Sequence, residues 1–220
     1  WCGWQEWAAV CADQIIRKVS DTDLSPSLAL GVLGLNGVTA LLALEKVGEP
    51  KAGDTVLVST AAGSVGSAVG QIARILGCRT VGITGGPDKV AICQDEFGYD
   101  AAIDYRAPGL DAAIAEHCPN GVNVYFDNTA GEISDTAYAH LALGARVVVC
   151  GTASISKWDP IPTGPRVERH LLTKRARMQG FVIFDHAARF GEAIDQLTDL
   201  LVAGQLVHDV RVESGIDRVP

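Results

Sequence analysis

Basic residues are scarce in this chain. Lys and Arg together number 18 against 26 Asp and Glu, which gives the 220 residues a formal net charge of −8. A surface with this balance repels phosphodiesters and anionic lipid headgroups. The composition therefore argues against nucleic acid and against a membrane surface as partners.

Paired cysteines are missing as well. The six cysteines form no C-x-x-C pair, and no histidine stands at metal-ligand spacing from them. A chain of this length with 48% hydrophobic residues can bury a large core without disulfide bonds. We expect reduced thiols, a cytoplasmic protein and no bound metal.

No uninterrupted hydrophobic run is suited to a membrane helix. The two uncharged stretches, residues 28–44 and 55–73, are broken by glycine and hydroxyl or amide side chains, where a span should be most apolar. No basic segment followed by an apolar one marks a leader. Because the chain begins at Trp1 without an initiator methionine, we expect an excerpt of a longer protein.

What the sequence does contain, from residue 54 onward, is a regular alternation of short β-branched runs and longer amphipathic runs. Parallel strands covered by helices on both faces have this pattern. It predicts an α/β fold with a doubly wound parallel sheet, the Rossmann arrangement. Strands are expected at residues 55–59, 79–84, 101–105, 123–128, 145–150 and 178–184, with helices at 65–76, 88–97, 110–117, 133–143 and from 190 to Gly204.

The flanks do not fit this sheet. We assign residues 26–206 to the Rossmann domain, residues 1–25 to the C-terminal part of a truncated second domain, and residues 207–220 to the start of the return to it. Val207, Val210 and Val212 suggest an extended segment there.

A glycine-rich turn follows the first predicted strand and opens a helix. Residues 61–66 (AAGSVG) match the dinucleotide-binding pattern G-x-G-x-x-G with alanine in the first position. Gly63 would let the backbone approach a pyrophosphate, and Gly66 would let the helix pack on the strand. The N–H groups of the first turn, which includes Ser64 and Val65, would face the anion. A glycine-rich turn that binds nothing is the alternative.

The second predicted strand lacks the acidic residue that holds the ribose hydroxyls of NAD. Its end reads Thr84-Gly85-Gly86, and Lys89 follows at the head of the next helix. Lys89 can pair with a 2′-phosphate that no carboxylate repels there. This favours NADP over NAD, against which stand the neighbouring Asp88 and the possibility that Lys89 is only a solvated helix residue.

A hydrolase is a competing interpretation of the same turn. Ser64 would be the nucleophile of an elbow of the G-x-S-x-G kind, and Asp127 with His186 or His208 would complete a triad. We regard this as the weaker reading, because such an elbow normally comes after several strands, whereas here it follows the first.

Together these stretches resemble one family, the zinc-independent medium-chain dehydrogenase/reductases, in the branch of prostaglandin reductases, leukotriene B4 12-hydroxydehydrogenase and 2-alkenal reductases. The fold that the resemblance implies is a Rossmann domain with fragments of a second, GroES-like catalytic domain. The matching segments run in order along nearly all of residues 26–206: 31–40, 56–66, 70–73, 77–78, 85–89, 100–105, 125–128, 149–151 and 177–182.

The resemblance implies an NADP cofactor and a set of contacts to it. Gly63, Ser64, Val65 and Gly66 would hold the pyrophosphate, Lys89 and Tyr105 the adenosine 2′-phosphate, and Asn128 would lie near the ribose. The nicotinamide would be flanked by Cys150, Gly151, Ser154 and Ile155, and its pocket lined by Phe181, Val182 and Ile183.

Two positions depart from relatives. Zinc-dependent members carry a cysteine ligand where this sequence has Leu35, so no catalytic zinc is implied. Some members have a tyrosine shortly before the last strand where Thr173 stands here, so the catalytic residues are left unassigned. The resemblance also implies a preceding catalytic half that this sequence lacks, so we expect the 220 residues alone to be inactive.

The function implied is NADPH-dependent reduction of the C=C bond of α,β-unsaturated aldehydes or ketones by hydride transfer to the β-carbon, in a homodimer. An NADPH:quinone reductase is the nearest alternative, with the same cofactor and a quinone substrate. A non-enzymatic module that binds NADP(H) for structure or sensing is the third reading.

Overall fold

The computed structural model of the chain describes residues 24–208 without interruption and, toward the ends, residues 5, 7–12, 15, 213–215 and 218. The two predicted pieces of a second domain, residues 1–25 and 207–220, thus lie largely outside the described residues. Their assignment stays a prediction.

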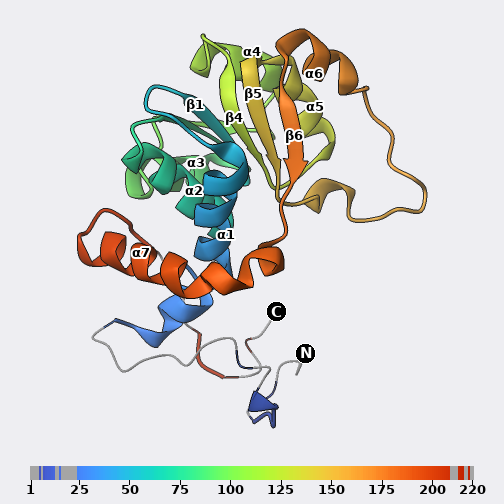
Figure 1. The fold of residues 1–220 in the computed structure, drawn as a ribbon. Coiled ribbons are helices and arrows are strands. Elements are labelled where there is room, and N and C mark those ends of the chain that lie inside the picture. The colour runs from blue at the N-terminus through green and yellow to red at the C-terminus, as the bar shows by residue number, and fades with distance from the viewer. Residues whose placement is uncertain are drawn as a thin grey trace.

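One six-stranded parallel sheet forms the centre of the molecule, with the strand order β3-β2-β1-β4-β5-β6 (Figure 1). The strand order reverses its direction between β1 and β4, as it does in doubly wound dinucleotide-binding folds. The predicted fold class is confirmed. The strands are β1 Thr55–Ser59, β2 Arg79–Thr84, β3 Ala101–Asp104, β4 Val122–Asp127, β5 Leu141–Val149 and β6 Arg177–Gly180.

Helices cover both faces of this sheet. They are α1 Leu35–Ala43, α2 Ser64–Ile75, α3 Pro87–Ala91, α4 Leu110–His117, α5 Gly131–Ala139, α6 Glu168–Lys174 and α7 Phe190–Val202. One-turn π segments extend α1 over Leu44–Gly48 and α3 over Ile92–Glu96, and 3₁₀ turns lie at Pro26–Leu30, Ala153–Ile155 and Ile183–Arg189. No helix among residues 24–208 has the length and apolarity required to cross a bilayer.

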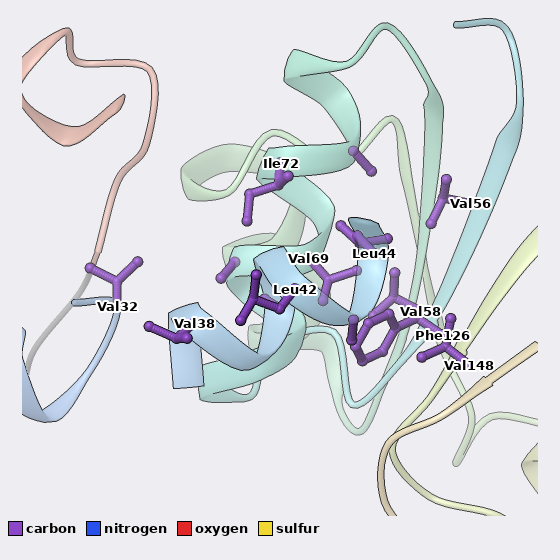
Figure 2. Close-up of a cluster of buried hydrophobic side chains, with 14 of the residues drawn as sticks. Val32, Val38, Leu42, Leu44, Val56, Val58, Val69, Ile72, Phe126 and Val148 are labelled. Atoms are coloured by element: carbon purple, nitrogen blue, oxygen red, sulfur yellow. The ribbon is translucent and has the colours of Figure 1, made fainter. Parts of the chain in front are cut away.

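The core has two halves, one on each face, because successive strand residues point to opposite sides. Figure 2 shows the first half, in which Val58 and Phe126 of the sheet face Leu42 of α1 and Val69 of α2. The second half is built on the alternate strand positions, such as Leu57 and Tyr125 beneath α4 and α5. Both halves are closed to water, so the strand ends are held rigidly.

Several elements differ from the predictions. The helix predicted at 133–143 ends at Ala139, and β5 begins at Leu141, where Leu141 pairs with Val122 of β4. The strand predicted at 178–184 ends at Gly180, because its one neighbour, β5, ends at Val149, the residue that pairs with Gly180. Helices α1 and α6 were not predicted; α6 has no buried residue, so its sequence carries no apolar stripe.

Candidate functional site

The turn between β1 and α2 is shaped by contacts that only glycine allows. Gly63 N–H donates to the Thr60 carbonyl at 2.8 Å, and Thr60 itself has a positive φ of 54°. A Cβ on Gly66 would lie 2.2 Å from that carbonyl oxygen and 2.9 Å from Ala61 Cα. Helix α2 therefore packs directly on the backbone of the turn, which is the part expected of Gly66.

Helix α2 begins in this turn, and no side chain caps its N-terminus. Helix α2 begins at Ser64, whose side chain is exposed, and the N-cap residue Gly63 contributes no side-chain hydrogen bond. The first N–H groups of a helix have no acceptor within it and carry partial positive charge. One turn further along α2, a Cβ on Gly70 would lie 2.1 Å from Cζ of the Tyr99 ring. The Tyr99 hydroxyl donates a hydrogen bond to the Gly66 carbonyl at 2.7 Å. This fixes the helix in place.

A cavity of about 380 Å³ opens beside this helix end, at the carboxyl ends of β2 and β3. It brings together three of the predicted residues, Lys89, Tyr105 and Ser154, which come from different segments. Its other walls are Thr60, Thr84, Gly85, Arg106, Thr129, Ile133 and Ala153. Two cationic side chains, Lys89 and Arg106, thus line one cavity together with the phenol ring of Tyr105.

Arg106 is a residue that the sequence reasoning missed. A Cβ on Gly85 would lie 3.0 Å from Arg106 Nε and 3.0 Å from Tyr105 Cε1, and the Arg106 guanidinium carbon lies 5.9 Å from the Tyr105 ring centre. Glycine at position 85 therefore makes room for both side chains. The only signal in the sequence was the position of Arg106 next to Tyr105, immediately after β3.

Asp104 connects the two loops that carry these cations. Its Oδ1 accepts the N–H groups of Gly86 and Arg106, each at 2.9 Å. These two hydrogen bonds hold the pKa of the Asp104 carboxyl below its ordinary value. The carboxylate is thereby directed to the backbone of the two loops.

The ends of β4 and β5 form the other side of the site. Asn128 Nδ2 donates to the Ser59 carbonyl at 2.7 Å, and Asn128 N–H donates to Ser59 Oγ at 2.8 Å. The N–H groups of Cys150 and Gly151 both donate to the Asp127 carbonyl, at 2.8 and 3.0 Å. A Cβ on Gly151 would lie 2.7 Å from the Asn128 carbonyl oxygen, so position 151 requires glycine.

The remaining predicted residues lie outside the cavity. Ile155 ends the 3₁₀ turn after β5, while Phe181 follows β6, where its N–H donates to the Val149 carbonyl at 3.0 Å. Phe181 is buried, Val182 is 57% exposed and Ile183 is half-buried. They share the carboxyl edge of the sheet with the cavity, but the structure does not bring them together with Lys89 and Tyr105.

The residues of the hydrolase reading do not form a triad. The His186 ring stacks on Phe181 with centres 4.9 Å apart, and a Cβ on Gly31 would lie 2.0 Å from His208 Nε2. The Asp127 carboxylate is hydrogen bonded by hydroxyl and backbone donors from its own neighbourhood. The turn at Ser64 therefore lacks an assembled base.

Known proteins are similar to this chain over most of its length. A family described as zinc-binding dehydrogenase matches residues 64–199. The chain is 43% identical over 221 residues to YfmJ of Bacillus subtilis (strain 168), covering 99% of this chain and 65% of that protein. It is 36% identical over 220 residues to the 2-alkenal reductase (NADP(+)-dependent) of Nicotiana tabacum, covering 99% of this chain and 64% of that protein.

A solved structure is also similar. CurA of Vibrio vulnificus in complex with NADPH superposes with a TM-score of 0.83 and 38% identity, over 91% of this chain and 61% of that one. The chain thus spans about 65% of the length of the Bacillus and tobacco relatives.

Zinc ligation is the point at which the family divides. Position 35, where the resemblance places a cysteine ligand in zinc-dependent members, is leucine at the start of α1. The chain belongs to the zinc-binding dehydrogenase family, as one of its zinc-independent medium-chain dehydrogenase/reductases.

Proposed function

We propose that this chain is the cofactor-binding part of an NADPH-dependent reductase that transfers hydride to the β-carbon of α,β-unsaturated aldehydes and ketones. The observation that carries the proposal is the cavity in which Lys89, Arg106 and Tyr105 meet beside the uncapped end of α2. The names of the tobacco 2-alkenal reductase and of the CurA complex with NADPH support it.

The residues present fit such a nucleotide. The exposed N–H groups at the start of α2 suit a pyrophosphate, and the glycine at 66 lets the helix end approach it. Two cations line the cavity at the ends of β2 and β3, which suits a phosphate at the 2′ position. No acidic side chain lines it, so the group that holds the ribose hydroxyls of NAD is missing there.

In this proposal each segment holds one part of the cofactor. Residues 63–66 bind the pyrophosphate, Lys89, Tyr105 and Arg106 bind the 2′-phosphate, and Asn128 lies at the ribose. Cys150, Gly151, Ser154 and Ile155 flank the nicotinamide, with Phe181, Val182 and Ile183 beyond them. The bound nicotinamide supplies a hydride, and the chain fixes the direction from which that hydride leaves.

The substrate carbonyl sets the remaining requirement. When the β-carbon accepts a hydride, negative charge develops on the carbonyl oxygen, and a hydrogen-bond donor at that atom stabilises it. A proton then reaches the α-carbon. We assign no proton donor to this chain. Since Thr173 lies on α6, where its hydroxyl donates to the Arg169 carbonyl at 2.8 Å, it is not proposed for this role.

Two further properties belong to the proposal. We propose a cytoplasmic enzyme, because Cys78, Cys93 and Cys118 are free thiols buried in the protein. We also propose a homodimer formed at the edge of the sheet. Strand β6 supports this, since it is bonded on one side only and its residues are largely exposed.

The test is an assay of the full-length protein with its N-terminal part present. NADPH oxidation, followed by absorbance, should be fast with 2-alkenals and slow with quinones, and NADH should be a poor substitute. Faster turnover of quinones would replace the proposed substrate class by the quinone reductase alternative. Tight NADPH binding without turnover of either acceptor would support the sensing module instead.

A further inference from the structure

Asp127, at the end of β4, is a buried carboxylate that the proposed function does not use. It is 1% exposed, and seven donors reach its two oxygens. Oδ1 faces the N–H groups of Thr129 and Ala130 at 2.9 Å and the hydroxyls of Tyr125, Ser59 and Thr129 at 3.2–3.3 Å, while Oδ2 faces Ser134 Oγ at 2.7 Å and Tyr138 Oη at 3.4 Å.

Every one of these donors is neutral. Within residues 24–208, no Lys, Arg or His forms an ion pair with Asp127. Neutral hydrogen-bond donors stabilise a carboxylate without cancelling its charge. A net negative charge therefore lies inside the protein, where water screens it poorly.

Asp127 lies at the end of β4, one of the two central strands of the sheet. β1 and β4 are neighbours at the point where the strand order reverses, and the Asp127 network joins Ser59 at the end of β1 to Ser134 on α5. The Asp127 carbonyl also holds the N–H groups of Cys150 and Gly151. These two residues flank the nicotinamide in the proposed function.

The field of Asp127 reaches that segment. The pKa of the Cys150 thiol is raised to about 11, first by burial and second by the charge of Asp127. The same charge contributes to raising the pKa of Tyr138, after burial. A charge that disfavours an anion at position 150 favours a cation there.

We propose that the buried carboxylate of Asp127 favours the oxidised over the reduced form of the bound nicotinamide, and so makes the cofactor a better hydride donor. This inference rests on the proposed function. A hydride that leaves C4 of a reduced nicotinamide for the substrate β-carbon carries two electrons, and the neutral ring becomes a cation. A nearby buried anion stabilises that cation. Asp127 touches neither reactant and acts through its charge alone.

The experiment measures the dissociation constants of NADP⁺ and NADPH for the full-length protein by calorimetry or fluorescence. In Asp127→Asn the carbonyl oxygen can keep the two backbone N–H contacts while the charge is lost. We expect the ratio of the NADP⁺ constant to the NADPH constant to rise by about threefold or more over wild type. A tenfold rise would correspond to about 30 mV in the two-electron potential of the bound nucleotide.

Two control variants separate charge from structure. Ser134→Ala removes the shortest hydrogen bond to Asp127 but keeps the charge, and Glu132→Gln removes an exposed charge from the same helix; both should leave the ratio within about twofold of wild type. Asp127→Ser neutralises the site a second way and serves if the asparagine variant does not fold. Both nucleotides are measured on one preparation, so unfolded protein does not alter the ratio.

An unchanged ratio in the neutral variants would overturn the inference, as would an equal rise in Ser134→Ala. Failure of the wild-type protein to bind either nucleotide would instead overturn the proposed function. The two failures are therefore distinguishable.

Discussion

The side chain of Gln71 pairs with the backbone of Val207 as a neighbouring strand would. Val207 N–H donates to Gln71 Oε1 at 2.7 Å, and Gln71 Nε2 donates to the Val207 carbonyl at 2.9 Å. Gln71 is only 2% exposed. A residue in the middle of α2 thus holds the backbone at Val207, five residues after the end of α7 at Val202.

Replacing the Gln71 side chain should weaken the attachment of Val207 to α2. In Gln71→Leu the two backbone groups of Val207 lose their hydrogen-bond partners, and the loss of these two bonds should cost about 1–3 kcal/mol of unfolding free energy. Urea denaturation checks the value. Equal stability of Gln71→Leu and wild type would show that the pair contributes nothing.

Arg106→Ala should weaken NADPH binding as Lys89→Ala does. Each variant loses one charged partner of the 2′-phosphate, at about 1–3 kcal/mol, and neither should change NADH binding. Calorimetry with both nucleotides measures this. Lys46→Ala, in which the lost cation pairs with Glu45 on the π segment after α1, is the control. Equal losses for NADPH and NADH would contradict a 2′-phosphate site.

Gly66→Ala should damage the turn severely. The added Cβ would meet the Thr60 carbonyl oxygen at 2.2 Å, so the helix or the turn must shift, and we expect a loss of about 2–4 kcal/mol in stability together with weaker nucleotide binding. Thermal unfolding and calorimetry measure the two effects.

Gly191→Ala is the matched control, since position 191 is a helical glycine with no atom within 4 Å of the new Cβ. It should raise stability by about 0.5–1 kcal/mol. If both glycine variants behaved alike, the close packing at position 66 would be refuted.

Alkaline pH should destabilise the fold through its buried thiols. Burial raises the pKa of Cys78, Cys93, Cys118 and Cys150 from 9.0 to about 11. A group that binds its proton more tightly when folded contributes stability that is complete below the unfolded pKa and is lost as pH rises toward the folded one.

The free energy of unfolding should accordingly fall between about pH 9 and pH 11, and chemical denaturation at a series of pH values tests this. Cys93→Ala lowers stability at neutral pH by leaving a small void, but its decline with pH should be shallower than that of wild type. Parallel curves for the two proteins would assign the decline to other groups.

Local patterns explain which elements were predictable. β1 and β2 match their predicted bounds because β-branched runs stand between clear turn residues, and α4 matches at 110–117. The segment at Leu141 has apolar residues at spacings that suit a helix as well as a strand, and only its pairing with Val122 of β4 decides for the strand. Helix α6 is exposed and carries no periodic signal.

In the candidate site, too, some residues could be predicted from the sequence and others could not. The turn at 63–66 and the cation at Lys89 follow from positions along the chain, because parallel strands end at one edge. Arg106 gives no such signal, since a lone basic residue after a strand is ordinarily solvated. The Asp127 network joins Ser59 and Asp127, 68 residues apart, and hydroxyl groups that distant show no pattern in a sequence.

The phenol ring of Tyr99 fills the space that the Cβ of any larger residue at position 70 would need. Neither position can be altered in isolation: a larger residue at 70 needs a smaller one at 99, and a smaller ring leaves a void that glycine cannot fill. Descendants of this protein should therefore change both positions together or neither, and a designer who wishes to vary one must redesign the pair.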